Sequence, residues 1–188
     1  MSLEHAILGF LNYEPMTGYE LKKIFDQSIK HFWPAKQSHI YRVLPQMEEK
    51  GWLTVEVIQQ DTRPARKVYH LTERGRAELQ AWLAADQPPS ETRLAWLIQL
   101  FFAGQLSDEV VLGLLEHQAS LIRHRLQRLG GIPAESSQQM DGSETPRDRF
   151  YWMLTVDYGV ASAIAQLRWL EEVIARIRRS QYELPTIG

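Results

Sequence analysis

The chain has 188 residues, of which 44% are hydrophobic, 23% charged and 10% aromatic, a composition that excludes disordered, collagen-like and low-complexity classes. The absence of cysteine excludes disulfide frameworks, thiol nucleophiles and thiolate zinc sites. A formal net charge of -2 gives no overall attraction to nucleic acid, so any binding of that kind must come from local basic patches.

The N-terminus and the apolar runs indicate a cytoplasmic protein. The first five residues, Met-Ser-Leu-Glu-His, lack the basic segment of a signal peptide. The longest apolar run, 94–104, is too short to span a bilayer and contains Gln99. Together with the lack of cysteine, these features predict a cytoplasmic location.

Charged residues are distributed differently in the two halves of the chain. Residues 1–86 carry 11 basic and 11 acidic side chains, including all six lysines, whereas residues 87–188 carry 10 arginines, 12 acids and no lysine. The segment Asp86-Gln-Pro-Pro89 between them is typical of a linker. We therefore predict one domain over 1–86 and a second over 87–188.

Three short helices are predicted first. One ends at Asn12 after an apolar repeat formed by Ala6, Ile7, Phe10 and Leu11. A second begins with a T-x-x-E capping box at Thr17 and Glu20, and its predicted buried face consists of Leu21, Ile24 and Phe25. A third follows Phe32-Trp33-Pro34 and ends at Gly51, with a buried face of Ile40, Val43, Leu44 and Met47. Pro45 predicts a kink or a restart within it.

A β-hairpin and a fourth helix complete the predicted first domain. Residues 52–58 and 67–71 alternate and contain β-branched side chains, which is typical of half-buried strands. The hairpin tip, 61–66, is basic and contains Pro64. Thr72 is the predicted cap of a helix over about 73–85, with Leu79 and Trp82 facing inward.

The second half is predicted to be entirely helical. Ser90 is expected to cap a helix with a wide apolar face made of Leu94, Leu97, Ile98, Phe101 and Phe102. A longer helix follows Ser107 and stops at Gly130-Gly131. Residues 132–144 are polar and aperiodic, which predicts a mobile loop. Thr145, Pro146 and Asp148 then begin the last helix.

This last helix carries four heptads of alternating three- and four-residue spacing. The repeating positions, called the seam below, are Met153, Val156, Val160, Ala163, Leu167, Leu170, Ile174 and Ile177. Ile164, Trp169 and Val173 add apolar surface beside it. We predict dimerisation with a second copy through Met153, Val156, Val160, Leu167, Leu170, Ile174 and Ile177, and we expect Leu167→Asp to disrupt the dimer.

The order of three helices and a hairpin is typical of a winged helix-turn-helix, in which the third helix enters the major groove. The start of that helix, 36–42, carries donors and no acid, and the hairpin adds Arg63, Arg66 and Lys67. Because both basic patches fall at the two DNA-facing points of one fold, the sequence predicts DNA binding.

Several motifs resemble the PadR-type transcriptional regulators. They are Thr17-Gly-Tyr-Glu-Leu21, Phe32-Trp-Pro-Ala35, the third helix through Gly51-Trp52, and Tyr69-x-Leu71-Thr72-x-x-Gly75. The resemblance covers 3–84, and the remainder is similar to the virulence-activator α C-terminal domain of AphA-like members. The family implies a homodimer on a pseudo-palindromic operator, with repression favoured over activation and often a response to a small aromatic compound.

The resemblance also implies roles for individual residues. The recognition helix would present Ser38, His39, Tyr41 and Arg42, with Lys36 near phosphate and the wing at Arg63, Arg66 and Lys67. Tyr19 and Lys22 would reach the DNA backbone. Arg42 is expected to discriminate bases, whereas Arg63 should contribute equally on all sequences.

Two other functional classes are alternatives to DNA binding. The chain lacks the motifs of phosphate-binding loops, serine hydrolases and zinc proteases, and His117 and His124 lie too far apart to share a metal, so we predict no enzyme, cofactor or metal. Aromatic residues in the second half suggest a small-molecule sensor, although packing in the core and the dimer interface is the favoured role for them. An interaction protein with the same helices but no specific DNA binding is the other alternative. The candidate ligand residues are Trp96, Phe101, Trp152 and Trp169, whose alternative role is packing.

Overall fold

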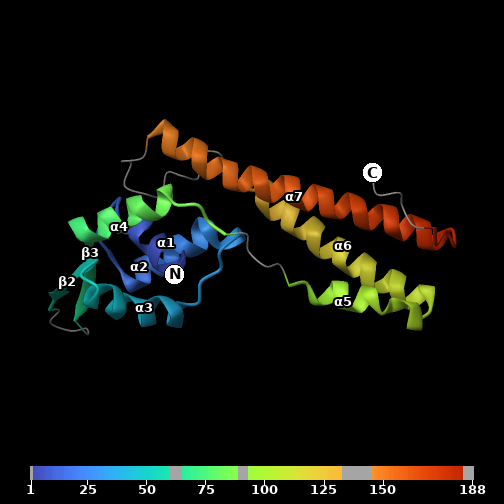
Figure 1. Cartoon of the computed structure of the whole chain (residues 1–188), viewed down its shortest axis with the longest axis horizontal. Helices are drawn as coiled ribbons and strands as arrows, with labels where there is room; N and C mark the ends of the chain where they lie inside the picture. The colour runs from blue at the N-terminus through green and yellow to red at the C-terminus, as the bar shows by residue number, and fades with distance from the viewer. Residues whose placement is uncertain (1, 60–64, 89–92, 133–144, 184–188) are drawn as a thin grey trace. The chain divides into compact units, whose positions relative to one another are not determined.

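The computed structural model describes residues 2–59, 65–88, 93–132 and 145–183 (Figure 1). The chain divides into two compact units. The first combines Met1–Pro88 with Ser137–Asp148, and the second combines Pro89–Ser136 with Arg149–Gly188. Across the described ranges, every helix is too short or too polar to cross a bilayer.

The first unit combines α-helices with a small antiparallel sheet. Its elements are α1 (Ser2–Leu11), β1 (Met16–Thr17), α2 (Gly18–Gln27), the 3-10 turn η1 (Ile29–His31), α3 (Gln37–Glu49), β2 (Leu53–Ile58), β3 (Arg66–Leu71) and α4 (Glu73–Ala84). The strand order is β1-β3-β2, and Thr17 pairs with Val68. The predicted helices and hairpin are confirmed. The strand β1 is not predicted by the sequence, because two residues before a helix show no strand alternation.

One hydrophobic core joins α1, α2 and α3. Its fully buried or nearly fully buried side chains include Ile7, Leu8, Leu21, Phe25, Ile40, Leu44 and Met47. The predicted capping box is present: Oγ1 of Thr17 accepts the Glu20 N–H at 3.2 Å, and Oε2 of Glu20 accepts the Thr17 N–H at 2.8 Å. This packing anchors one face of α3 in the core and leaves the opposite face in solvent.

α3 continues through Pro45 as a single helix. A proline there lacks the N–H that would bond the Tyr41 carbonyl, so a restart was one expectation. The helix does not restart, because Leu44 and Met47 on either side of the proline are both fully buried in the core. The chain leaves the helix at Gly51, whose φ of 70° lies in the left-handed region that favours glycine.

Gly75 brings the start of α4 against the backbone of Trp52. A Cβ at Gly75 would lie 2.3 Å from the Trp52 carbonyl oxygen and 2.8 Å from Cδ1 of Leu71. Thr72 secures this approach, because its Oγ1 donates to the Gly51 carbonyl at 2.7 Å and accepts the Gly75 N–H at 3.0 Å. The Leu71-Thr72-x-x-Gly75 motif therefore requires glycine at its last position, because any side chain there would clash with the backbone of Trp52.

We expect Gly75→Ala to lower the free energy of unfolding by about 1–3 kcal/mol, because a clash with backbone cannot be relieved by a rotamer change. Urea denaturation followed by circular dichroism measures this loss. Gly9→Ala is the matched control, since a Cβ in the middle of α1 meets no atom within 4 Å. Equal stability of the two variants would contradict the steric explanation.

The second unit contains two long antiparallel helices and a short one. Its elements are α5 (Ala95–Phe101), the 3-10 turn η2 (Ala103–Gln105), α6 (Asp108–Gly130) and α7 (Pro146–Arg178), whose first three residues belong to the first unit. Arg123 pairs with Glu171 at 2.7 Å, and Arg178 pairs with Glu116 at 2.6 Å. The two pairs are seven residues apart on each helix, so α6 and α7 keep one register along this stretch. With this register, α6 ends near the midpoint of α7 (Figure 1).

The core of this unit lies between α5, α6 and α7. Its buried residues are Ala103, Val111, Leu115, Ala119, Leu170 and Ile174. The predicted start of α7 is confirmed, because the Thr145 N–H donates to Asp148 at 2.8 Å and the Asp148 N–H donates to Oγ1 of Thr145 at 3.2 Å. The predicted loop lies, from residue 133 onward, outside the described residues.

The seam prediction needs a correction for Leu170 and Ile174. They are 0% and 7% exposed and pack within their own chain, so they are not available to a partner in this structure. Leu167 and Ile177 are half-buried against the same cluster. The heptad pattern identified a buried face correctly, but periodicity does not say which chain covers it. Met153, Val156 and Val160 lie in the half of α7 beyond α6 and stay predicted interface residues.

The helix predicted from Ser90 also differs. α5 begins only at Ala95, after Leu94 as its N-cap, and Ser90 lies outside the described residues. The predicted apolar face is largely in solvent, with exposed fractions of 64% for Ile98 and 82% for Phe101. α5 therefore buries little of this face within its own chain.

Candidate nucleic-acid interface

The solvent face of α3 carries the candidate DNA-reading residues. Ser38, Tyr41 and Arg42 are three and four residues apart, so they share one helix face, and all three are exposed. The buried residues of α3 occupy the opposite face, as predicted. No acid lies in the first turn of α3, and its N-cap, Lys36, makes no side-chain cap bond. The positive end of the helix therefore faces solvent without a carboxylate of its own.

Tyr41 is seated against the first residue of α2. A Cβ at Gly18 would lie 2.8 Å from Cε1 of Tyr41 and 2.9 Å from its Cζ, so the ring occupies the space that a side chain would need. The absence of a side chain at Gly18 thus lets α3 place this ring over the start of α2. Tyr19, the next residue, is 68% exposed.

The candidate DNA-contacting side chains differ in whether they already have a partner. Within the described part of the chain, Lys36, His39, Arg42 and Lys67 make no ion pair or hydrogen bond through their side chains. Lys22 instead pairs with Asp26 on the same helix. Arg63 lies outside the described residues. The unpaired donors therefore lie at the start of α3 and on β3, while Lys22 is partly neutralised.

Arg66 of β3 forms an ion pair with the start of α2. Its Nη2 donates to Oε1 of Glu20 at 2.8 Å, while Oε2 of Glu20 accepts from both the backbone N–H and the hydroxyl of Thr17 at 2.8 Å. Burial alone would raise the pKa of Glu20, but the hydrogen bonds from Thr17 and the charge of Arg66 outweigh it and lower the pKa. The carboxylate is therefore ionised at neutral pH and neutralises Arg66.

The sequence did not reveal this pair. The sequence indicates only a capping role for Glu20 and only a role in the hairpin wing for Arg66, and 46 residues separate them. No local spacing rule links such distant positions. The two-residue strand β1 links these positions, because its pairing of Thr17 with Val68 brings the start of α2, and with it Glu20, beside β3.

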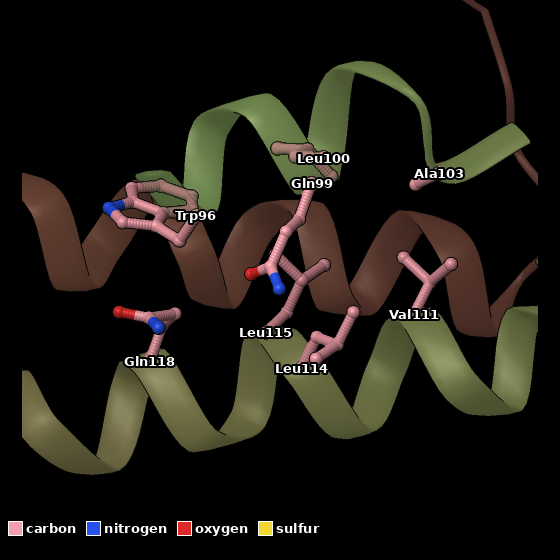
Figure 2. A pocket seen from close by; sticks show the side chains of 8 residues that line it. All are labelled: Trp96, Gln99, Leu100, Ala103, Val111, Leu114, Leu115 and Gln118. Atoms are coloured by element: carbon pink, nitrogen blue, oxygen red, sulfur yellow. The ribbon is translucent and has the colours of Figure 1, made fainter. Parts of the chain in front are cut away.

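A second candidate site is a pocket between α5 and α6 (Figure 2). Its lining residues are Trp96, Gln99, Leu100, Ala103, Val111, Leu114, Leu115 and Gln118. The cavity volume is about 10 Å³, which is room for one water molecule, whereas an engineered cavity that binds benzene has about 150 Å³. The pocket is therefore too small for an aromatic compound in this conformation.

The four predicted ligand residues do not converge on one pocket. Trp96 lines the pocket between α5 and α6, and its ring lies 6.1 Å from that of Trp169. Phe101 is instead 82% exposed and lines an open hollow with Leu97. Trp152 lies in the first half of α7. Within the described residues, no group of three His, Asp or Glu side chains is placed to hold a metal ion.

Two protein-family models match separate parts of the chain. Residues 7–81 match the Transcriptional regulator PadR-like family, and residues 92–178 match the Virulence activator alpha C-term family. The probable transcriptional regulator Rv1176c of Mycobacterium tuberculosis is 45% identical over 93 residues, which are 50% of this chain and 48% of that protein. The negative transcriptional regulator PadR of Bacillus subtilis is 28% identical over 176 residues, which are 93% of this chain and 97% of that protein.

Solved structures extend these similarities over nearly the whole chain. Bacillus subtilis PadR in complex with operator DNA has a TM-score of 0.79 at 28% identity, covering 94% of this chain and 99% of that chain. The same regulator in complex with p-coumaric acid has a TM-score of 0.77 at 28% identity, and the match covers 95% of this chain and 99% of that chain. The Vibrio cholerae virulence activator AphA has a TM-score of 0.72 at 25% identity, with coverage of 95% and 99%.

Proposed function

Because the chain belongs to the PadR-like family of transcriptional regulators and carries the virulence-activator α C-terminal domain, we propose that it binds a pseudo-palindromic operator as a homodimer and represses transcription. The relative that supports this proposal is Bacillus subtilis PadR, a negative transcriptional regulator that was solved in complex with operator DNA. The family consists of regulators and not of enzymes, so no catalytic step is assigned.

The observation that carries the proposal is the set of unpaired donors at the two points where a winged helix contacts DNA. Lys36 and Arg42 lie on the solvent side of α3, and Lys67 lies on β3. An arginine in the major groove can donate to O6 and N7 of guanine, whereas lysines contact phosphates. We assign base reading to α3 through Ser38, Tyr41 and Arg42 and backbone contacts to Lys36 and Lys67.

A second copy is supported by a large apolar surface on the second unit. We call it the outer face and define it by Ile98, Phe101, Phe102, Val110, Leu114 and Leu121, all exposed. A hollow of about 410 Å³ lies among the side chains of α5 within it. Exposed apolar side chains in this number typically mark an interface, and an identical copy would contribute the same residues in return. We include the first half of the seam, Met153, Val156 and Val160 of α7, in the same proposed interface.

Operator binding tests the proposal directly. The purified protein is mixed with DNA from upstream of its own gene at several salt concentrations, with unrelated DNA as competitor. We expect tight, salt-sensitive binding that resists the competitor, and protection of an inverted repeat with half-sites about 34–36 Å apart. Equally weak binding to both DNAs would favour an interaction module instead.

We also propose that a small aromatic compound regulates this binding, since Bacillus subtilis PadR was solved with p-coumaric acid. The pocket between α5 and α6 is not proposed as its site, because an aromatic ring does not fit there. Titration of the operator complex with p-coumaric acid tests regulation, and we expect release of the DNA. A complex unaffected at millimolar acid would contradict sensitivity to this compound.

A further inference from the structure

One contact connects the capping box of α2 with the wing, which we define as β2 and β3. We propose that Glu20 is a built-in competitor of the DNA backbone, whose carboxylate neutralises Arg66 and thereby lowers the affinity of the wing for phosphate. This inference rests on the proposed function, because it assigns a role within the same DNA-binding surface.

The carboxylate of Glu20 is held in place before it meets Arg66. Oε2 accepts two hydrogen bonds from Thr17, one from the backbone and one from the hydroxyl, and Oε1 is left to face Arg66. An ordinary surface ion pair is weak partly because two long side chains must be ordered to form it. Here the helix cap has already ordered one partner, and the positive end of α2 favours its negative charge.

Arg66 and Lys67 are neighbouring cations of β3, and within the described residues only Arg66 has a carboxylate partner. Successive side chains of a strand point to opposite faces, so Arg66 shares a face with Val68 and Lys67 faces the other way. Val68 pairs with Thr17 of β1, which places the Arg66 face beside the start of α2. Arg66 therefore meets a carboxylate, while Lys67 has no partner within the described residues.

Counterion release converts this difference into a measurable quantity. Each phosphate neutralised by a protein cation adds about 0.9 to the slope of log affinity against log salt. An arginine already neutralised by its own protein adds little. Removal of the Glu20 charge should free Arg66 for phosphate and steepen the slope by about one. Because phosphate contacts carry no sequence information, the gain should be the same on operator and random DNA.

The test uses the full chain with Glu20→Gln, because glutamine can still accept the Thr17 N–H in a capping box. We expect a slope steeper by about one and, near 0.15 M salt, about fivefold tighter binding on both DNAs. Glu20→Ala also removes the cap, so it should show the same slope with a lower thermal midpoint. The double variant with Arg66→Gln should lose the added slope.

Glu171→Gln is the matched control. It removes one negative charge from a partly exposed ion pair with Arg123, in the second unit, and should leave the slope unchanged. An unchanged or flatter slope in folded Glu20→Gln would overturn the inference, as would a steeper slope that persists without Arg66. If the wild-type protein itself shows no salt-dependent DNA binding, the proposed function fails, which is a distinct result.

Discussion

Arg42→Ala should lower operator affinity by about 10- to 100-fold and reduce discrimination between bases, because one bidentate contact to a base pair is worth about 1–3 kcal/mol. Arg42 is exposed on the solvent face of α3 and has no partner within the described residues, so its removal leaves no buried charge behind. Its neighbours Ile40 and Leu44 are fully buried on the other face, so the helix itself should remain folded. Fluorescence anisotropy with operator and random duplexes measures both affinities.

Lys67→Ala is the comparison for Arg42→Ala. Lys67 is an unpaired cation on β3, and a phosphate contact there should weaken binding uniformly and lower the log–log salt slope by about one. Arg42→Ala should instead lose more on the operator than on random DNA. Equal losses on both DNAs for both variants would contradict the assignment of base reading to α3.

Local patterns predicted most of the first unit. The Thr17 capping box, the buried positions Ile40, Leu44 and Met47, and the Thr72 cap all lie within a few residues of the features that define them. Short-range rules of this kind depend on neighbouring residues and not on the tertiary structure. They also placed the solvent face of α3 correctly, because a helix with one buried face must expose the other.

Contacts between distant residues could not be predicted in the same way. The Glu20–Arg66 pair depends on how β1 aligns with β3, and the burial of Leu170 depends on the register of α7 against α6. The same heptad pattern is compatible with a helix from the same chain or from a second copy. Only the placement of α6 decides that Leu170 and Ile174 belong to the intrachain core.

The burial of Leu170 and Ile174 within their own chain changes which variant tests dimerisation. Leu167 packs against the intrachain core, so Leu167→Asp would disturb the fold of the second unit as well as any interface. Phe101 is 82% exposed, and a charge at this position costs little in an isolated chain. An aspartate facing a second copy would instead be buried without a partner, which is strongly unfavourable.

We therefore expect Phe101→Asp to convert the dimer into a folded monomer, as measured by sedimentation equilibrium with circular dichroism as the check on folding. Leu83→Asp is the matched control, since Leu83 is 66% exposed on α4, outside the outer face. It should remain dimeric. A dimeric Phe101→Asp variant would exclude the outer face as the interface.

Loss of the dimer should also abolish tight operator binding. A monomer presents one copy of α3, so the second half-site no longer benefits from the high effective concentration that dimerisation provides, and affinity should fall by about 100-fold or more. Binding to random DNA should fall much less. Leu170→Asp separates this effect from unfolding, because a charge at a fully buried position should remove the helical signal of the second unit, whereas Phe101→Asp should retain it.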